Sequence, residues 1–376
     1  MSAHHVYLVP GFFGFANLGQ ITYFGHVRRF LAGRLRELGL DAHLHAVRVH
    51  PTASLPRRAA QLAETIAATA RGRAAAVHLV GHSSGGLDAR LLAAPGCALP
   101  SGVDVERIAR RVRTVVTVAT PHHGTPLASL FATLRGQRLL QLVSLGTIHL
   151  LRFGHLPLSV VLGLGAFVAR LDDLAVNSDL LDEVFDRLLR DFTPGRRRSV
   201  GALLDEVVRD QALLVQLTPE AMEVFDASVS PRRSVRHASV VTQAARPRLA
   251  SRLAAGLDPA AQLSRTFFGA LHRLAAETPR RRSPRLEPAQ ARALRRGYGA
   301  LPTPAANDGI VPTRSQAWGR ILHTALADHL DVLGHFRDAD DDSPHVDWLW
   351  SGSRFDRRQF EALWNDVARF LAKDGD

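Results

Sequence analysis

The sequence contains a single cysteine, Cys97, among 376 residues. One cysteine excludes an intramolecular disulfide, and with it the small disulfide-stapled folds. A chain of this length can bury enough apolar surface to fold without a covalent or metal staple. Hydrophobic residues make up 46% of the sequence and charged residues 22%, and both fractions are ordinary for a globular protein.

Long hydrophobic runs are also missing. The longest apolar stretch, residues 156–169, covers about 14 residues and is too short to cross a bilayer. The first residues enter an apolar run without the basic start, the longer apolar segment and the cleavage site of a secretory signal. We therefore expect a soluble, cytoplasmic protein.

Lysine is almost absent: Lys373 is the single lysine, and arginine supplies all the other basic residues apart from histidine. The formal net charge is +12. The arginine clusters at 196–198, 232–233 and 280–282 lie beside proline, glycine or serine, as loop residues do. No helix-turn-helix, zinc-finger or aromatic RNA-binding pattern accompanies them. We interpret this charge as solvated loop charge and expect no nucleic-acid partner.

Strand-like and helical spacings alternate along the first third of the chain. This alternation predicts an α/β fold with a mostly parallel central sheet and helices on both faces. Later strand-like segments and a closing helix indicate one domain over residues 1–376. The expected strands are 6–9, 44–49, 77–80, 114–119, 238–242, 310–311 and 321–324, and the expected helices are 24–38, 55–70, one from about 87, and 360–371.

The alternation breaks after residue 125, where a mainly helical pattern begins. We expect residues 125–235 to form a helical lid or cap inserted into the α/β domain. Leu127 and Leu130 belong to the first apolar segment of this insertion. If the insertion overhangs the active site, these two side chains would bind substrate.

The strongest local signal is Gly81-His82-Ser83-Ser84-Gly85, which has the pattern Gly-x-Ser-x-Gly. It follows an apolar strand and precedes a helix, the context that gives this motif its meaning. A sharp strand-to-helix turn exposes the serine hydroxyl, and side chains two residues on either side would collide. The motif therefore predicts Ser83 as a nucleophile.

A serine hydroxyl needs a base, and the base needs an acid to orient it. In hydrolases with this turn the chain order is serine, acid, histidine. Asp308, in an Asn-Asp-Gly turn, and His329, in a loop after the last expected strand, satisfy that order. His335 and His345 remain alternatives for the base, and Asp328 and Asp331 remain alternatives for the acid.

The tetrahedral intermediate of acyl transfer needs two N–H donors for its oxyanion. The Ser84 N–H, at a helix N-terminus, is one candidate. The Phe12 N–H is the other, because the glycine-rich loop after the first strand lets the backbone approach closely. Phe13 and His82, next to these groups, are expected to contact the substrate.

Five segments together resemble the bacterial true lipases, also called triacylglycerol lipases. The segments are 9–15, 81–87, 119–125, 307–309 and 328–331. They occur in the family's order, whereas the region between residues 125 and 307 matches poorly.

The resemblance implies an α/β-hydrolase fold, carboxylic ester hydrolysis and a helical lid between the sixth strand and the acid. It also implies that Ser83, Asp308 and His329 form the catalytic triad and that the N–H groups of Phe12 and Ser84 are the oxyanion donors. The sequence departs from the family at Pro10, where a histidine is usual, and in lacking a leader.

The family often holds a structural calcium ion through an acid two residues after the catalytic histidine. Asp331 occupies that position, but the sequence offers no companion acid upstream of Asp308. The acidic run 338–342 is interpreted as a solvated loop. We therefore expect no metal site and no required cofactor.

The sequence thus predicts a lipase or esterase that forms a covalent acyl-enzyme on medium- or long-chain acyl esters. Its partners would be a small-molecule ester or a lipid, with transient contact of the lid with a lipid surface; the sequence indicates no oligomeric state. Thioesterase, phospholipase and acyltransferase reactions with the same triad stay open. An inactive hydrolase fold acting as a binding module is a further alternative, against which the intact order of triad residues argues.

Overall fold

The computed structural model describes most of the chain outside the predicted insertion. The described residues are 4–12, 23–70, 72, 75–133, 186, 190, 193–195, 197–198, 210–246, 259–277, 283–336 and 349–373. Phe13, His345 and the acidic run 338–342 lie outside them, as do residues 134–185 of the expected lid.

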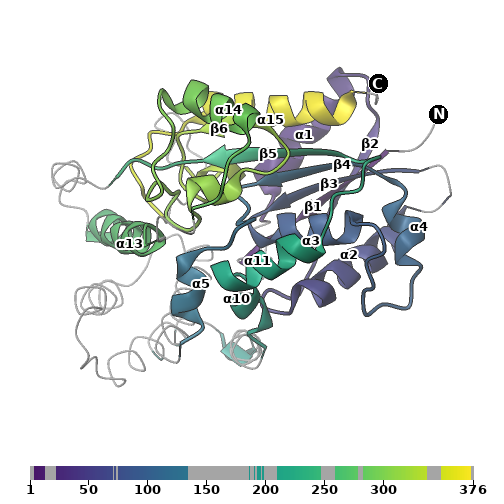
Figure 1. Cartoon of the computed structure of the whole chain (residues 1–376), viewed down its shortest axis with the longest axis horizontal. Coiled ribbons are helices and arrows are strands. Elements are labelled where there is room, and N and C mark those ends of the chain that lie inside the picture. The colour runs from purple at the N-terminus through teal and green to yellow at the C-terminus, as the bar shows by residue number, and fades with distance from the viewer. Residues whose placement is uncertain are drawn as a thin grey trace.

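A six-stranded sheet forms the centre of the molecule, with strand order β2-β1-β3-β4-β5-β6 and every neighbouring pair parallel. This arrangement confirms the predicted α/β class and its parallel sheet (Figure 1). The strands are β1 His4–Val9, β2 Ala42–Ala46, β3 Ala76–His82, β4 Val112–Val118, β5 Arg236–Thr242 and β6 Arg320–Ala325.

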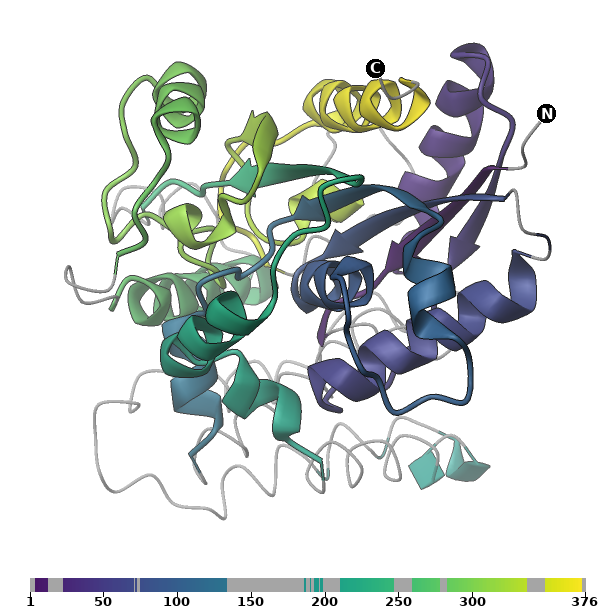
Figure 2. The same ribbon diagram turned by 45° about the vertical axis from the view of Figure 1, so that its right-hand side comes forward.

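Helices cover both faces of the sheet (Figures 1 and 2). On one face lie α1 (Gly25–Glu37), α14 (Pro288–Tyr298) and α15 (Arg357–Ala372); on the other lie α2 (Leu55–Thr69), α3 (Ser84–Ala93) and α4 (Val105–Ala109). The remaining described helices are α5 (Pro126–Phe131), α10 (Ala212–Gln216), α11 (Pro219–Ser228) and α13 (Pro259–Ala275), with short 3-10 turns at Thr313–Gln316 (η3) and Asp331–Leu333 (η4).

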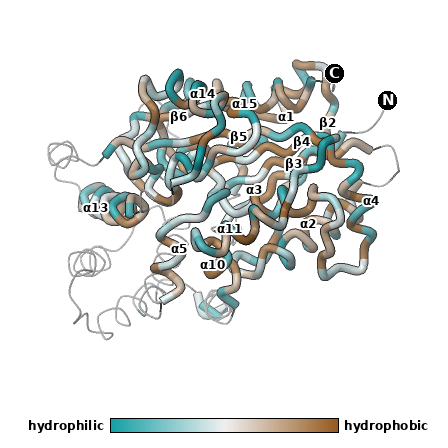
Figure 3. The backbone as a smooth tube through the Cα atoms, viewed as in Figure 1, coloured by the Kyte–Doolittle hydropathy of each residue, from teal (hydrophilic) through white to brown (hydrophobic). Residues whose placement is uncertain are grey.

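Two apolar cores lie on the two sides of the sheet, and strand β1 contributes to both. Val6 and Leu8 belong to the core under α1 and α15, whereas Tyr7 and Val9 belong to the core under α2 and α3. Because both faces are covered, the strand is apolar at successive positions instead of alternating. Figure 3 shows apolar residues concentrated along the central strands.

Residues 310–311 do not form a strand, and that prediction is wrong. Ile310 and Val311 lie in a turn closed by a bridge between Asn307 and Pro312, and both of their N–H groups donate to the carboxylate of Asp308. Two other boundaries shift. Strand β2 ends at residue 46 instead of 49, and α3 begins at Ser84, three positions before the expected start.

Both ends of the predicted 125–235 insertion pack against the α/β body. The Thr125 N–H donates to the Leu217 carbonyl at 3.0 Å, and the Leu213 N–H donates to Thr52 at 2.9 Å. The Leu55 N–H, at the start of α2, donates to Gln216 at 2.7 Å. The first bond joins the two ends of the insertion to each other, and the other two join α10 to the start of α2 and to Thr52 before it. Asp226, on α11, pairs with Arg90, on α3, at 2.6 Å, and Leu127, on α5, belongs to the apolar core. Within the described part of the chain, no helix is long and apolar enough to span a membrane.

A buried histidine lies on β3. The ring of His78 bonds to His4 at 3.0 Å and to Thr114 at 2.9 Å. Burial, followed by the charges of His4, Arg236 and Arg113, lowers the pKa of His78 from 6.5 to about 3. The unfolded chain therefore binds a proton between pH 6.5 and 3 that the folded chain does not.

Acid is expected to destabilise the fold through His78. The stability contributed by its neutral ring is complete above pH 6.5 and falls as the pH drops toward 3, by at most about 1.4 kcal/mol per pH unit. His78→Gln removes this titration, so its free energy of unfolding should depend less on pH. Urea unfolding of both proteins at pH 7 and pH 5 measures the difference, and equal losses on acidification would contradict the assignment.

Candidate active site

The predicted catalytic residues lie in loops at the carboxyl edge of the sheet. Gly11 follows β1, Ser83 follows β3, and His329 follows β6. In parallel sheets the loops at this edge converge, and ligands bind among them. The fold therefore brings together loops that are hundreds of residues apart in the sequence.

Ser83 occupies a strained turn between β3 and α3. Its backbone has φ 55° and ψ −134°, a region that residues with side chains rarely adopt and that costs about 1–3 kcal/mol. Two hydrogen bonds hold it there: the Ser83 N–H donates to Val118 at 2.9 Å, and the Gly86 N–H donates to Ser83 at 3.0 Å. Such strain is typical of functional positions.

The glycines around Ser83 are required by the packing of this turn. A β-carbon on Gly81 would overlap the backbone of Gly85, and one on Gly85 would overlap the carbonyl of Val9. A β-carbon on Gly86 would overlap the side chain of Thr120. The steric reason that predicts glycine two residues either side of Ser83 is therefore present in the structure.

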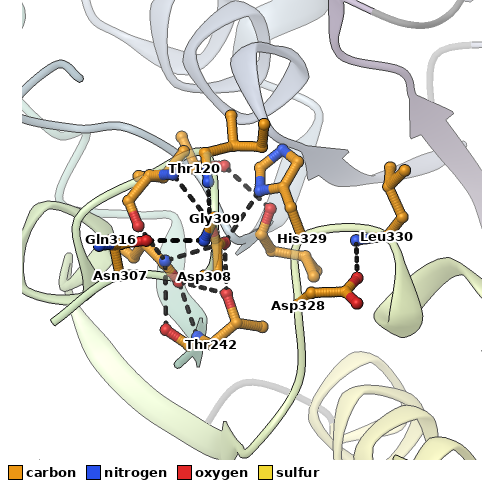
Figure 4. A network of polar contacts seen from close by, with 12 residues as sticks. Thr120, Thr242, Asn307, Asp308, Gly309, Gln316, Asp328, His329 and Leu330 are labelled. Atoms are coloured by element: carbon orange, nitrogen blue, oxygen red, sulfur yellow. Dashed lines mark hydrogen bonds and ion pairs between the residues drawn. The ribbon is translucent and has the colours of Figure 1, made fainter. Parts of the chain in front are cut away.

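The carboxylate of Asp308 is fully buried and fully bonded. Its Oδ1 accepts the N–H groups of Ile310 and Val311 at 3.0 and 2.7 Å. Figure 4 shows the other oxygen facing three side chains. The donors to Oδ2 are Thr242 Oγ1 at 2.7 Å, Gln316 Nε2 at 3.1 Å and His329 Nδ1 at 2.9 Å.

His329 is held against Asp308 by its ring and its backbone. Besides the Nδ1 contact, the His329 N–H donates to the Asp308 carbonyl at 3.1 Å. The ring is 1% exposed. Since Nδ1 donates to the carboxylate, Nε2 is the nitrogen that can take up a proton. The structure thus places the predicted base and acid together.

The alternative residues are arranged differently. Asp328 Oδ1 accepts the N–H of Leu330 at 2.9 Å (Figure 4) and that of Asp331 at 3.0 Å, which holds the turn that carries His329. Burial raises the pKa of Asp328 to about 6. The His335 ring packs against His26, with centroids 6.5 Å apart. Neither Asp328 nor Asp331 is seen to bond to the His329 ring.

The predicted oxyanion loop lies directly against the nucleophile. A β-carbon on Gly11 would come 2.5 Å from Ser83 Cβ and 3.0 Å from its Oγ. Phe12, the next residue, is buried. Ser84 is the first residue of α3, where an N–H has no intrahelical acceptor. Gly11 and Ser84 therefore adjoin Ser83 from segments that follow two different strands, and Phe12 is the residue after Gly11.

A buried ion pair that the sequence reasoning missed supports this loop. Arg58 bonds to Asp88, on α3, at 2.7 Å, and both side chains are fully buried. The same guanidinium donates to the carbonyl of Pro10 at 2.7 Å. A signal was present, because Arg58 falls on the apolar stripe of α2 with Leu55 and Leu62, where a charged residue needs a buried partner.

The residues predicted to contact substrate have different surroundings. Both ring nitrogens of His82 bond to protein atoms, and the residue is 1% exposed. Leu127 is 1% exposed and belongs to the apolar core, with Phe131 packed beside it. Leu130 is half-buried, and Phe13 lies outside the described residues.

No protein-family model and no curated protein matches this sequence. Among solved structures, lipase 1 from Pelosinus fermentans aligns with a TM-score of 0.53 at 17% identity, over 100% of both chains. EstA from Clostridium botulinum aligns with a TM-score of 0.54 at 17% identity, over 98% of this chain and 87% of that one. The chain shares the fold of these bacterial proteins, in agreement with the expected α/β-hydrolase fold.

Asp331, the position that the resemblance associates with calcium, bonds to neighbouring protein groups. Its Oδ2 accepts the Asp328 N–H at 2.8 Å and the Ser353 hydroxyl at 2.7 Å. Within the described ranges, no three His, Cys, Asp or Glu residues are grouped to hold a metal ion. The bonds of Asp331 are those of a residue that stabilises the turn.

The two buried acids near His329 offer a matched test of the acid's identity. Asp308→Asn should reduce kcat by about 10⁴-fold, because an amide favours the wrong histidine tautomer. Asp328→Asn keeps the Oδ1 acceptor and should stay within a few-fold of the parent. Steady-state ester hydrolysis by both variants decides this. A loss of kcat confined to Asp328→Asn would show that Asp328, and not Asp308, is the acid of the triad.

The close approach of Gly11 to Ser83 offers a second test. Gly11→Ala should lower kcat strongly because its methyl group displaces the oxyanion loop or the serine. A β-carbon on Gly33, in α1, meets nothing within 4 Å, so Gly33→Ala should leave the rate unchanged and stabilise the helix by about 1 kcal/mol. Kinetics and thermal unfolding of both variants check this. Equal kcat values for Gly11→Ala and Gly33→Ala would show that Gly11 does not belong to the active site.

Proposed function

We propose that this chain is a serine carboxylic ester hydrolase, a lipase or esterase that acts through a covalent acyl-enzyme. The contact between Asp308 and His329, at the sheet edge where Ser83 lies in a strained turn, carries the proposal. The motifs that resemble the bacterial true lipases and the lipase fold of its structural neighbour support the same reaction.

In the first half-reaction, Ser83 Oγ would attack the carbonyl carbon of the ester while His329 Nε2 takes its proton. Asp308 stabilises the imidazolium that forms. The N–H groups of Phe12 and Ser84 would hold the oxyanion. When the tetrahedral intermediate collapses, the bond to the leaving alkoxide breaks, and His329 returns its proton to that oxygen.

In the second half-reaction, a water molecule would replace the alcohol. His329 removes a proton from this water as its oxygen attacks the acyl carbon, and the same two N–H groups hold the second oxyanion. Collapse breaks the bond to Ser83, which recovers its proton from His329, and the carboxylic acid leaves. Every proton moves between groups of the chain, the substrate and water.

The acyl group is proposed to be medium or long. Leu130, half-buried on α5, would then line an acyl channel, and each buried methylene would contribute about 0.8 kcal/mol, roughly fourfold in kcat/KM. Thioesters, phospholipids or acyl acceptors other than water are compatible with the same triad.

Replacement of Ser83 tests the proposal. Ser83→Ala should lower the hydrolysis of p-nitrophenyl esters by about 10⁶-fold, because no other hydroxyl would be activated by His329. Ser84→Ala keeps the backbone N–H and should retain most of the rate. The measurement is kcat/KM for a series from acetate to palmitate.

Activity in Ser83→Ala together with inactivity in Ser84→Ala would show that the nucleophile has been assigned to the wrong serine. Hydrolysis of acetate esters alone would argue for a plain esterase and against the acyl channel. Circular dichroism and thermal unfolding serve as the folding control, since Ser83→Ala removes only an oxygen.

A further inference from the structure

His82, the residue before the nucleophile, joins parts of the active site that come from different strands. Its Nε2 bonds to the carbonyl oxygen of His329 at 2.9 Å. Its Nδ1 bonds to the hydroxyl of Tyr23 at 2.6 Å. The same hydroxyl lies 3.3 Å from the backbone N of Gly11 and accepts its N–H. The side chains of Tyr23, His82 and His329 are all buried.

The hydrogen atoms in this chain of contacts have one consistent arrangement. The carbonyl of His329 can only accept, so His82 Nε2 carries the hydrogen and Nδ1 is the acceptor. The Tyr23 hydroxyl therefore donates to Nδ1 while its oxygen accepts the Gly11 N–H. Burial lowers the pKa of His82 well below its usual value and raises the pKa of Tyr23, so both groups stay neutral.

The groups at the ends of this chain are those whose relative positions matter for catalysis. Gly11 precedes the oxyanion donor Phe12, His82 precedes the nucleophile, and His329 is the base. The His82 ring also packs on the His329 ring, with centroids 4.7 Å apart at 50°. Asp308 fixes His329 from one side, and His82 contacts it through ring and backbone.

We propose that Tyr23 and His82 are positioning residues whose hydrogen-bonded relay fixes the oxyanion loop and the base relative to Ser83. This assignment rests on the proposed function for its effect on rate. It gives His82 a role different from the substrate contact predicted from its place in the motif. A misplacement of about 1 Å at such a site costs on the order of 100-fold in rate.

Tyr23→Phe removes only the hydroxyl and breaks its bonds to His82 and to the Gly11 N–H. Its kcat should fall about 10- to 100-fold, with KM changing far less, because substrate binding does not involve the hydroxyl. The matched control is Tyr7→Phe. Tyr7 is another buried tyrosine, on β1, and its hydroxyl bonds to Thr69, on α2, at 2.7 Å. Tyr7→Phe should retain the parent kcat.

A second pair of variants separates positioning from folding. His82→Gln keeps a donor for the His329 carbonyl and an acceptor for Tyr23, so it should recover part of the activity lost in His82→Leu. Thermal unfolding is measured for all variants. Parent-like kcat in Tyr23→Phe, or equal kcat in His82→Gln and His82→Leu, would overturn the proposal.

The relay can also be tested without any substrate. Two-bond ¹H–¹⁵N correlation spectra of the full chain labelled at histidine report each ring's tautomer, and His82→Gln identifies the His82 signals. We expect the Nε2–H form, with the Nδ1 shift moving in Tyr23→Phe but not in Tyr7→Phe. An Nδ1–H form would refute the relay. If the parent chain hydrolyses no ester, the proposed function fails while this spectrum still decides the relay.

Discussion

The buried carboxylate of Asp308 is the interaction on which the rest of the site depends. A carboxylate removed from water is strongly destabilising unless its oxygens are hydrogen-bonded. Here five donors converge on it, from β5, from η3, from its own turn and from His329. The requirement to satisfy this one group therefore fixes the end of a strand, two loops and the tautomer of the base.

A second constraint is the backbone strain at Ser83. The turn is costly by itself, but its neighbours leave it little alternative: β4 accepts its N–H, and the backbone of β1 lies where a side chain on Gly85 would be. The Arg58–Asp88 pair adds a link between the oxyanion loop and α3. Stability elsewhere in the sheet thus offsets strain at the position where exposure of a hydroxyl is useful.

The sequence predicts much of this arrangement because the chemistry leaves local traces. Runs of buried β-branched residues reveal the parallel strands, and the glycines around Ser83 reveal the turn. Asp308 and His329 follow from residue type and chain order. The strand and turn signals depend on near neighbours in the sequence, and the order of residues along the chain can be determined without knowledge of the fold.

The features that the sequence did not predict depend on residues that are distant in the sequence or on contacts made only in the folded chain. Ile310 and Val311 resemble a strand, yet a carboxylate two or three residues back captures their N–H groups. Tyr23 carries no local signal, because its partner His82 is brought beside it only by the sheet. Gln316 and Thr242 are ordinary polar residues until both meet Asp308.

The proposed reaction depends on the activation of Ser83 as a nucleophile by His329 and Asp308. The most direct measurement is mass spectrometry of the full chain after reaction with a fluorophosphonate, which forms a stable adduct only with an activated serine. We expect one adduct per chain, on the peptide that contains Ser83, and none in His329→Ala. An unmodified chain, or an adduct on any other residue, would contradict the proposed activation.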